Sequence, residues 1–90
     1  MKTIYKYEIP VDDNIRLELP KGAEILSVQE QYGKPCIWAI VDPEKEVEGR
    51  LFELLGTGHN IKASEIINRK YIGTFQLYNG ALVFHLFELI

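Results

Sequence analysis

Cysteine, histidine and serine, which often carry metal or nucleophilic chemistry, are scarce in this chain. Its 90 residues include one cysteine and two histidines. A single thiol, Cys36, cannot form an internal disulfide, and two distant histidines do not show the paired spacing of a zinc site. Neither Ser27 nor Ser64 lies in a nucleophile motif such as Gly-x-Ser-x-Gly. We therefore expect no metal, no cofactor and no enzymatic activity, and the cysteine content fits a cytoplasmic protein.

Long apolar runs are missing as well. No stretch approaches the roughly 20 apolar residues that a membrane span needs. Residues 1–10 alternate between polar and apolar side chains and contain no continuous apolar segment of the kind found in a signal peptide. The sequence therefore predicts a soluble protein that has no membrane partner.

Neither sign of charge dominates. The net charge is −3 and the isoelectric point is about 5.3, whereas a domain that binds duplex nucleic acid usually carries a basic face. Direct binding to duplex nucleic acid is therefore not expected. The contents of 47% hydrophobic and 26% charged residues are typical of globular proteins, and the length predicts one domain, residues 1–90.

Polar and apolar residues alternate with a period of two in many segments of the sequence, and this pattern predicts β-strands. The expected strands are residues 3–9, 15–19, 23–31, 36–41, 49–55, 69–78 and 81–89. A short helix near residues 62–68 is the one helical element that the pattern allows. We therefore expect a mainly β fold of about seven strands, in which a small antiparallel sheet is rolled into a barrel or a sandwich.

Three local patterns refine this prediction. Residues 36–41 are apolar at both parities, which indicates a central strand buried on both faces. Asn79-Gly80 lies between two β-rich runs and is a strong hairpin signal, because both turn residues need positive φ. In residues 23–31, the alternation predicts that Leu26 and Val28 face inward.

The segment at residues 56–59 is the most unusual local motif. Its glycines allow a tight turn that could present backbone N–H groups to an anion, and neighbouring basic side chains would offset a phosphate charge. The candidate ligand-binding residues are Gly56, Thr57, Gly58, His59, Lys62 and Arg69. The segment lacks the Gly-Lys-Ser/Thr ending of a phosphate loop, so the alternative is a loop shaped by glycine with an exposed histidine.

The second histidine, His85, lies in an apolar run and shares its parity with Val83 and Phe87. We interpret it as a hydrogen-bonded histidine in or near the core. Acid–base cleavage of RNA by His59 and His85 together is the alternative, but nothing in the sequence places the two rings near each other.

Acidic residues gather in one short segment, where they could dock on a basic surface of a partner protein. These candidate partner-binding residues are Asp42, Glu44, Glu46 and Glu48. A solvated loop is the alternative explanation of the same pattern.

Six segments follow one another in a fixed order along nearly the whole chain. They are Leu19-Pro20-x-Gly22-Ala23, Ile25-Leu26-Ser27-Val28-Gln29, Trp38-Ala39-x-Val41-Asp42, Gly56-Thr57-Gly58-His59, Tyr71-Ile72-Gly73-Thr74 and Gly80-Ala81-Leu82-Val83-x-His85-x-Phe87. Together they resemble a family of short uncharacterised proteins of bacteriophages and of bacterial prophage loci. The resemblance implies an accessory protein made inside a host cell, and proteins of that kind are often inhibitors of host defence, including anti-CRISPR proteins.

We therefore expect a non-enzymatic protein that binds and blocks or modulates a host protein, by means of a rigid β surface or an exposed sheet edge. One alternative is a small-ligand binder, such as a nucleotide sponge that uses residues 56–59. Another is a structural or assembly protein of a phage. Small β domains also commonly form symmetric dimers, so a homo-oligomer stays open.

Overall fold

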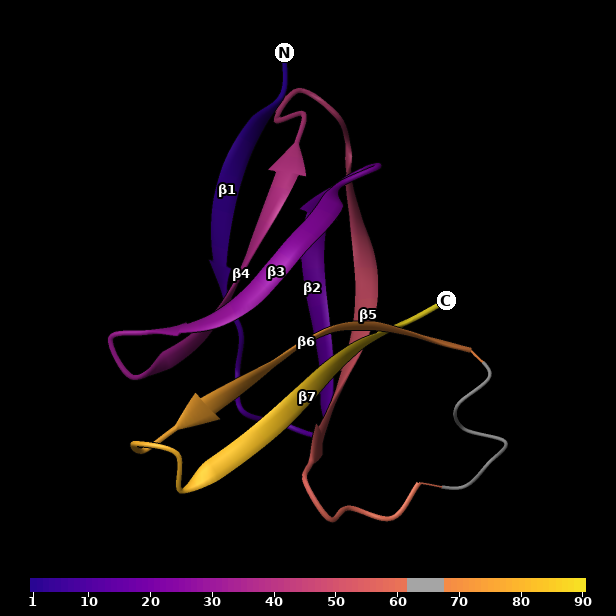
Figure 1. The fold of residues 1–90 in the computed structure, drawn as a ribbon. Helices are drawn as coiled ribbons and strands as arrows, with labels where there is room; N and C mark the ends of the chain where they lie inside the picture. Colours follow the sequence, from indigo (N-terminus) through magenta and orange to yellow (C-terminus); the bar gives the residue numbers. More distant parts are fainter. Residues whose placement is uncertain (62–67) are drawn as a thin grey trace.

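The computed structural model describes residues 1–61 and 68–90, and within these ranges it contains seven strands and no helix (Figure 1). The strands are β1 (Thr3–Glu8), β2 (Asn14–Pro20), β3 (Glu24–Gln31), β4 (Lys34–Val41), β5 (Val47–Gly56), β6 (Arg69–Leu77) and β7 (Leu82–Leu89). The mainly β prediction with seven strands is confirmed. The helix expected near residues 62–68 falls almost entirely outside the described residues.

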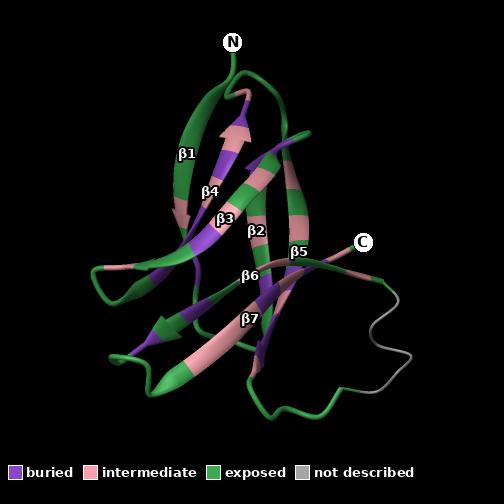
Figure 2. Ribbon diagram, in the orientation of Figure 1, coloured by how far each residue is buried: buried purple, intermediate pink, exposed green. Residues whose placement is uncertain are grey.

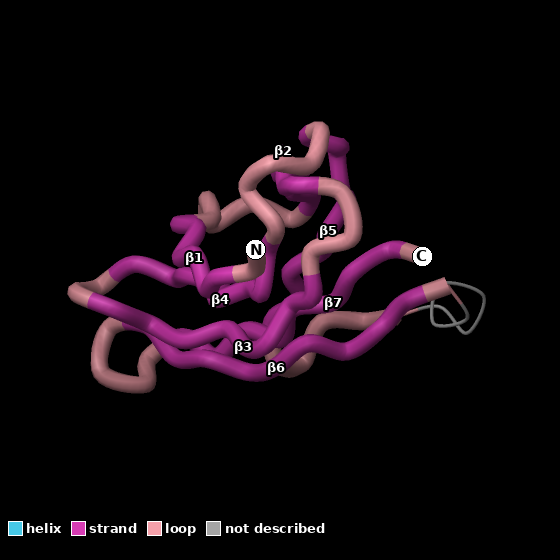
Figure 3. The backbone as a smooth tube through the Cα atoms, turned by 90° about the horizontal axis from the view of Figure 1, so that it is seen from above, coloured by secondary structure: helices cyan, strands magenta, loops and turns pink. Residues whose placement is uncertain are grey.

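The strands form two antiparallel sheets. One has the order β1-β4-β3 and the other the order β2-β5-β7-β6. Seen from above, the strands follow an open curve in which β3 lies beside β6, with β1 and β2 toward the two ends (Figure 3). The described strands do not close into a barrel, so the structure confirms the rolled or sandwiched prediction only as far as two antiparallel sheets that share a core.

The core lies between the two sheets, and Figure 2 shows buried residues along β4 and in parts of β5 and β7. Its largest fully buried side chains are Phe52, Leu19, Ile37, Leu86 and Val41. Strand β4 is central in its sheet, as its apolar sequence predicts. One of its faces is fully covered, whereas Trp38 and Ile40 on the other face are half-buried.

Two hairpin turns follow from local sequence. Asn79 and Gly80 have φ angles of 55° and 89°, and the N–H of Ala81 donates to the Tyr78 carbonyl at 3.1 Å. Asn79 and Gly80 thus have the positive φ angles that the Asn-Gly signal needs, and β6 and β7 pair up to Leu77 and Leu82, so the hairpin prediction is confirmed. Tyr32 and Gly33, with φ angles of 53° and 80°, make a two-residue turn between β3 and β4.

Strand β3 contains a bulge that the alternation does not predict. Its register against β4 shifts between Ile25 and Ser27, so Leu26 is the extra residue. The prediction that Leu26 faces inward is wrong: its side chain is 44% exposed, while Val28 is buried. A bulge adds one residue to one strand and therefore reverses the parity of the residues that follow.

A largely buried ion pair holds the start of β3 against the second sheet. Arg50 of β5 donates from Nε and Nη2 to the two carboxylate oxygens of Glu88 of β7, at 2.6 and 2.8 Å. The Nη1 of Arg50 also donates to the carbonyl of Ala23, which directly precedes β3. The hydrogen bond to Glu88 raises the pKa of Arg50 above its usual value. The negative charge of the buried Glu88 is thus compensated by the guanidinium group of Arg50, which donates to both carboxylate oxygens.

Candidate functional site

His85 lies on the outer face of the four-stranded sheet, where two threonine hydroxyls hold its ring. In the register of the sheet, His85 of β7 lies opposite Thr74 of β6 and Leu55 of β5, so these side chains share one face. The distance from His85 Nδ1 to Thr74 Oγ1 is 2.9 Å, and that from Nε2 to Thr57 Oγ1 is 2.8 Å. The expected hydrogen bonds of His85 are confirmed, but its half-buried ring lies on the outer face of the sheet and not in the core.

Tyr71 extends this network to the surface. Its hydroxyl lies 2.6 Å from Thr74 Oγ1, and its ring centroid lies 5.5 Å from that of Phe87 at an interplanar angle of 58°. The Tyr71 side chain is nevertheless 55% exposed. We call Thr57, Tyr71, Thr74, His85 and Phe87 the Tyr71–His85 cluster. It presents an aromatic ring to solvent while fixing that ring through two independent contacts.

The hydrogen bonds of His85 define the chemical groups of this cluster. Within residues 1–61 and 68–90, the hydrogen bonds of the His85 ring go to two neutral hydroxyls, and no carboxylate orients it. In the same ranges no group of three or more His, Cys, Asp or Glu side chains could hold a metal ion. The exposed phenol ring and the hydroxyls offer apolar contact and hydrogen bonds to a partner.

Residues 56–59, the predicted ligand-binding segment, take part in two different sets of contacts. Gly56 ends β5 opposite Phe84, and the Thr57 N–H donates to the Val83 carbonyl at 3.1 Å. The His59 N–H donates back to the Gly56 carbonyl at 3.0 Å. The Thr57 side chain joins the Tyr71–His85 cluster. Two backbone N–H groups of the segment are therefore used within the fold.

The basic residues predicted beside this segment have acidic neighbours. Arg69 donates from Nε and Nη2 to the carboxylate of Glu53, at 2.9 and 2.8 Å, and both side chains are largely buried. His59 lines an open depression that Asp13 and Glu53 also line. Lys62 lies outside the described residues. These placements leave anion binding by residues 56–59 a prediction.

Of the acidic residues predicted to bind a partner, Asp42, Glu44 and Glu46 lie in the connection from β4 to β5, and Glu48 lies in β5. Asp42 organises this turn, because its Oδ1 accepts from the Glu44 N–H and its carbonyl accepts from the Lys45 N–H, both at 3.1 Å. The carboxylate of Glu48 accepts a long hydrogen bond of 3.5 Å from the Gly22 N–H. The side chains of Glu44 and Glu46 are exposed, so docking through them stays a prediction.

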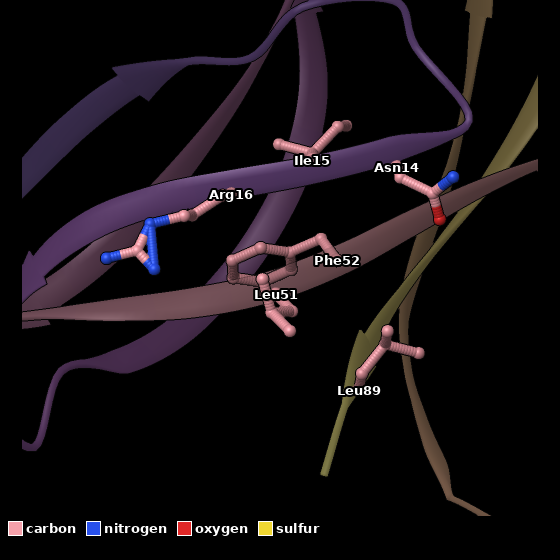
Figure 4. Close-up of a pocket in the computed structure, with 6 residues that line it drawn as sticks. All are labelled: Asn14, Ile15, Arg16, Leu51, Phe52 and Leu89. Atoms are coloured by element: carbon pink, nitrogen blue, oxygen red, sulfur yellow. The ribbon is translucent and has the colours of Figure 1, made fainter.

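A shallow apolar depression lies near the end of β7, where β7 stops pairing with β5. Figure 4 shows the residues that line it, which come from β2, β5 and β7. They are Asn14, Ile15, Arg16, Leu51, Phe52 and Leu89. The set contains one charged side chain and no pair of groups suited to acid–base chemistry, so we regard it as a part of the apolar surface of this sheet.

A bulge in β6 explains why sequence reasoning missed the Tyr71–His85 cluster. Tyr71 and Thr74 are three residues apart, and in a regular strand they would point to opposite faces. The register of β6 shifts between Tyr71 and Gly73, which places Tyr71 opposite Phe87 and Thr74 opposite His85 on the same face. The only local signal was Gly73, since glycine within a strand often marks a bulge or a close approach.

Comparisons with known proteins give a family but no activity. No helix long and apolar enough to cross a bilayer occurs in the part of the chain that the structure describes. No curated protein and no solved structure matches the chain. A family model described as a domain of unknown function, DUF7352, matches residues 1–90. The prediction of an uncharacterised family is thus confirmed, whereas a phage origin stays a prediction. The chain belongs to the DUF7352 family of domains.

Proposed function

We propose that this protein is a non-enzymatic binding module that recognises another protein through the outer face of its four-stranded sheet, with Tyr71 at the centre. The observation that supports this most directly is the state of Tyr71. Its side chain is 55% exposed, yet its ring packs on Phe87 and its hydroxyl is hydrogen-bonded to Thr74. An exposed aromatic ring with a fixed orientation is what a protein interface uses as an anchor.

The fixed geometry lowers the cost of binding. Each side chain that an interface must immobilise costs about 0.5–1.5 kcal/mol, and a side chain already held in place avoids most of that cost. Thr74 holds the Tyr71 hydroxyl, His85 holds Thr74, and Thr57 holds His85. The anchor is therefore connected to two strands, β6 and β7, and to the loop after β5, and it does not depend on one flexible contact.

The surroundings of Tyr71 suit a protein partner more than a small polar ligand. The face also carries Phe87 and Leu89, which are half-buried, and the exposed Leu51. Arg69 and Glu53 form a compensated ion pair on the same face. A mainly apolar surface that has aromatic anchors and few uncompensated charged groups is typical of the centre of a protein interface.

The partner that we propose is a protein of the host cell, which the domain blocks or modulates by covering a functional surface. The resemblance to short phage and prophage proteins supports this choice, and inhibitors of host defence are the class it favours. Occlusion needs only a rigid surface of sufficient size, so it is compatible with a chain in which we expect no catalytic group.

Affinity capture with matched variants tests the proposal. Immobilised wild-type protein, Tyr71→Ala and Tyr78→Ala would be exposed to lysate of the organism that encodes the chain, and captured proteins would be quantified by mass spectrometry. Tyr78 is a suitable control because it is 75% exposed but lies in the turn between β6 and β7. We expect a partner that is retained by wild type and Tyr78→Ala and reduced at least tenfold by Tyr71→Ala, as for an interface anchor. Equal capture by all three proteins would contradict a Tyr71-centred interface.

A further inference from the structure

We infer that β1 is the interface of a symmetric dimer, in which the β1 strands of two copies pair antiparallel with Lys2 of each copy opposite Glu8 of the other. Strand β1 is at the end of its sheet: it pairs with β4 on one side, and no described strand pairs with its other side. The dimer would join the two three-stranded sheets into one six-stranded sheet. This inference concerns a different edge from the Tyr71 face and does not rest on the proposed function.

The hydrogen-bonding groups available along β1 follow from one measured bond. The Ile9 N–H donates to the Pro35 carbonyl at 3.0 Å, directly after the last residue of β1. In an antiparallel pair, alternate residues bond to the neighbouring strand. Thr3, Tyr5 and Tyr7 therefore bond toward β4. The backbone N–H and C=O groups of Ile4, Lys6 and Glu8 point toward the free edge.

The charges along the free edge select one register. In an antiparallel pair centred on Tyr5, Lys2 of each copy lies opposite the partner's Glu8, and Ile4 lies opposite the partner's Lys6. A shift of two residues in one direction places Lys2 opposite the partner's Lys6, and a shift in the other direction places two Lys6 residues opposite each other. Like charges directly opposite are destabilising. A shift of one residue would misalign the free backbone groups.

The same register covers apolar side chains that are exposed in one copy. Tyr5 is 45% exposed and lies 6.4 Å from the Tyr7 ring between centroids. Centring the pair on Tyr5 places the two Tyr5 rings opposite each other, with a Tyr7 on each side. On the other face, Ile4 is 57% exposed and lies opposite Ile40 of β4 in the register of the sheet. Pairing would extend this apolar row into the second copy.

Edge strands are commonly protected by lysine, but the lysine at the middle of β1 does not project over the edge. Lys6 Nζ donates instead to Gln31 Oε1 of β3 at 2.7 Å, which directs the side chain back across β4. Glu8 has Lys34 as a neighbour at 3.6 Å, with both side chains exposed. The partner's Lys2 would add a second cation to the same carboxylate.

Strand β2, which ends the other sheet, is less suited to self-pairing. The N–H of Leu54 donates to the Asp13 carbonyl at 3.0 Å, so Asn14, Arg16, Glu18 and Pro20 direct their backbone groups to the free edge. Pro20 has no N–H to donate. Arg16 and Glu18 already pair with each other at 2.6 Å within the strand. Of these two edges, β1 is therefore the one that a second copy fits.

A charge-swap experiment tests both the dimer and its register. Sedimentation velocity over a range of concentrations would give the dimer dissociation constant for wild type, Lys2→Glu, Glu8→Lys and an equimolar mixture of the two variants. Each variant alone places like charges opposite each other, so we expect its dimer to weaken by about tenfold. The mixture restores both opposite-charge pairs, so we expect a heterodimer of near wild-type affinity.

Lys6→Pro is an independent test of the backbone pairing. Its N–H points to the free edge, so proline removes no bond to β4, and proline is tolerated on edge strands. We expect this variant to be monomeric with an unchanged β-rich circular dichroism spectrum. If it does not fold, the charge swap still decides. The inference is overturned if wild type stays monomeric up to about 1 mM, where even a weak association populates the dimer. A dimer that all these variants leave unchanged would equally overturn it, because association would then use another surface.

Discussion

Gly73 of β6 lies directly against Val28 of β3: a Cβ atom built on Gly73 would come within 3.0 Å of the Val28 Cγ1 atom. The two residues belong to different sheets, and each follows a bulge in its own strand. A side chain at position 73 would therefore separate the two sheets where β3 lies beside β6. The glycine serves close packing at this junction, since no positive φ is recorded for it.

Enlarging this glycine should destabilise the fold. We expect Gly73→Val to lower the free energy of unfolding by about 1–3 kcal/mol, as overpacking usually does. Urea denaturation followed by circular dichroism would measure the change. Gly56→Ala is the matched control, because a Cβ there meets no atom within 4 Å. Val28→Ala should relieve part of the effect in a double variant, and strict additivity of the two changes would argue against a direct contact.

Loss of the largely buried ion pair between Arg50 and Glu88 should also reduce stability. We expect Glu88→Gln to lower the free energy of unfolding by about 2 kcal/mol, because the guanidinium of Arg50 loses its charged partner in a largely buried site. The control is Glu18→Gln, which breaks the exposed pair with Arg16. An exposed pair contributes about 0–1 kcal/mol, so the control should change little. Equal effects of the two substitutions in thermal denaturation would mean that burial does not distinguish the pairs.

Stability should decrease at alkaline pH through Tyr7. Burial, and then the neighbouring Tyr5, raise the pKa of Tyr7 above its usual value of 10.0. In the unfolded chain the phenol loses its proton at lower pH than in the folded chain. The contribution of this group to stability is therefore complete below about pH 10 and is lost as the pH rises through the folded pKa.

Variants at two tyrosines would check this pH dependence. We expect Tyr7→Phe to make the decline in melting temperature above about pH 10 less steep. Tyr32→Phe should leave the decline unchanged, because Tyr32 is almost fully exposed in a turn. Indistinguishable pH profiles for wild type and Tyr7→Phe would show that Tyr7 is not the group responsible.

The stability of the Tyr71–His85 cluster and the order of its Tyr71 ring should depend on the Thr74 hydroxyl. Thr74→Val keeps the side-chain shape and the β-branched character but removes the hydrogen-bond partner of both Tyr71 and His85. We expect a loss of about 1 kcal/mol in the free energy of unfolding and greater motion of the Tyr71 ring. Aromatic ¹³C relaxation in solution would measure that motion. A Tyr71 ring that stays equally ordered would indicate that Phe87 alone fixes it.

The strands were predictable from the sequence because each depends on neighbouring residues. Alternation in residues 3–9 and 69–78 marks strands wherever they lie in the fold, and Asn79-Gly80 specifies its turn through its own φ angles. The apolar run at residues 36–41 likewise predicted the central place of β4. The candidate site was only partly predictable: His85 was expected to be hydrogen-bonded, but its partners Thr57 and Thr74 were not identified.

The sequence by itself determined seven strands, their turns and a mainly apolar interior, since these follow from backbone preferences and from the period of the side chains. Only the tertiary structure decided the order of strands in the sheets, the exposure of Leu26, and the meeting of Tyr71, Thr74 and His85 on one face. The physical reason is that a bulge changes side-chain parity, and a bulge is defined by the pairing of its strand with a neighbouring strand. Which strand becomes the neighbour depends on contacts between residues far apart in the chain.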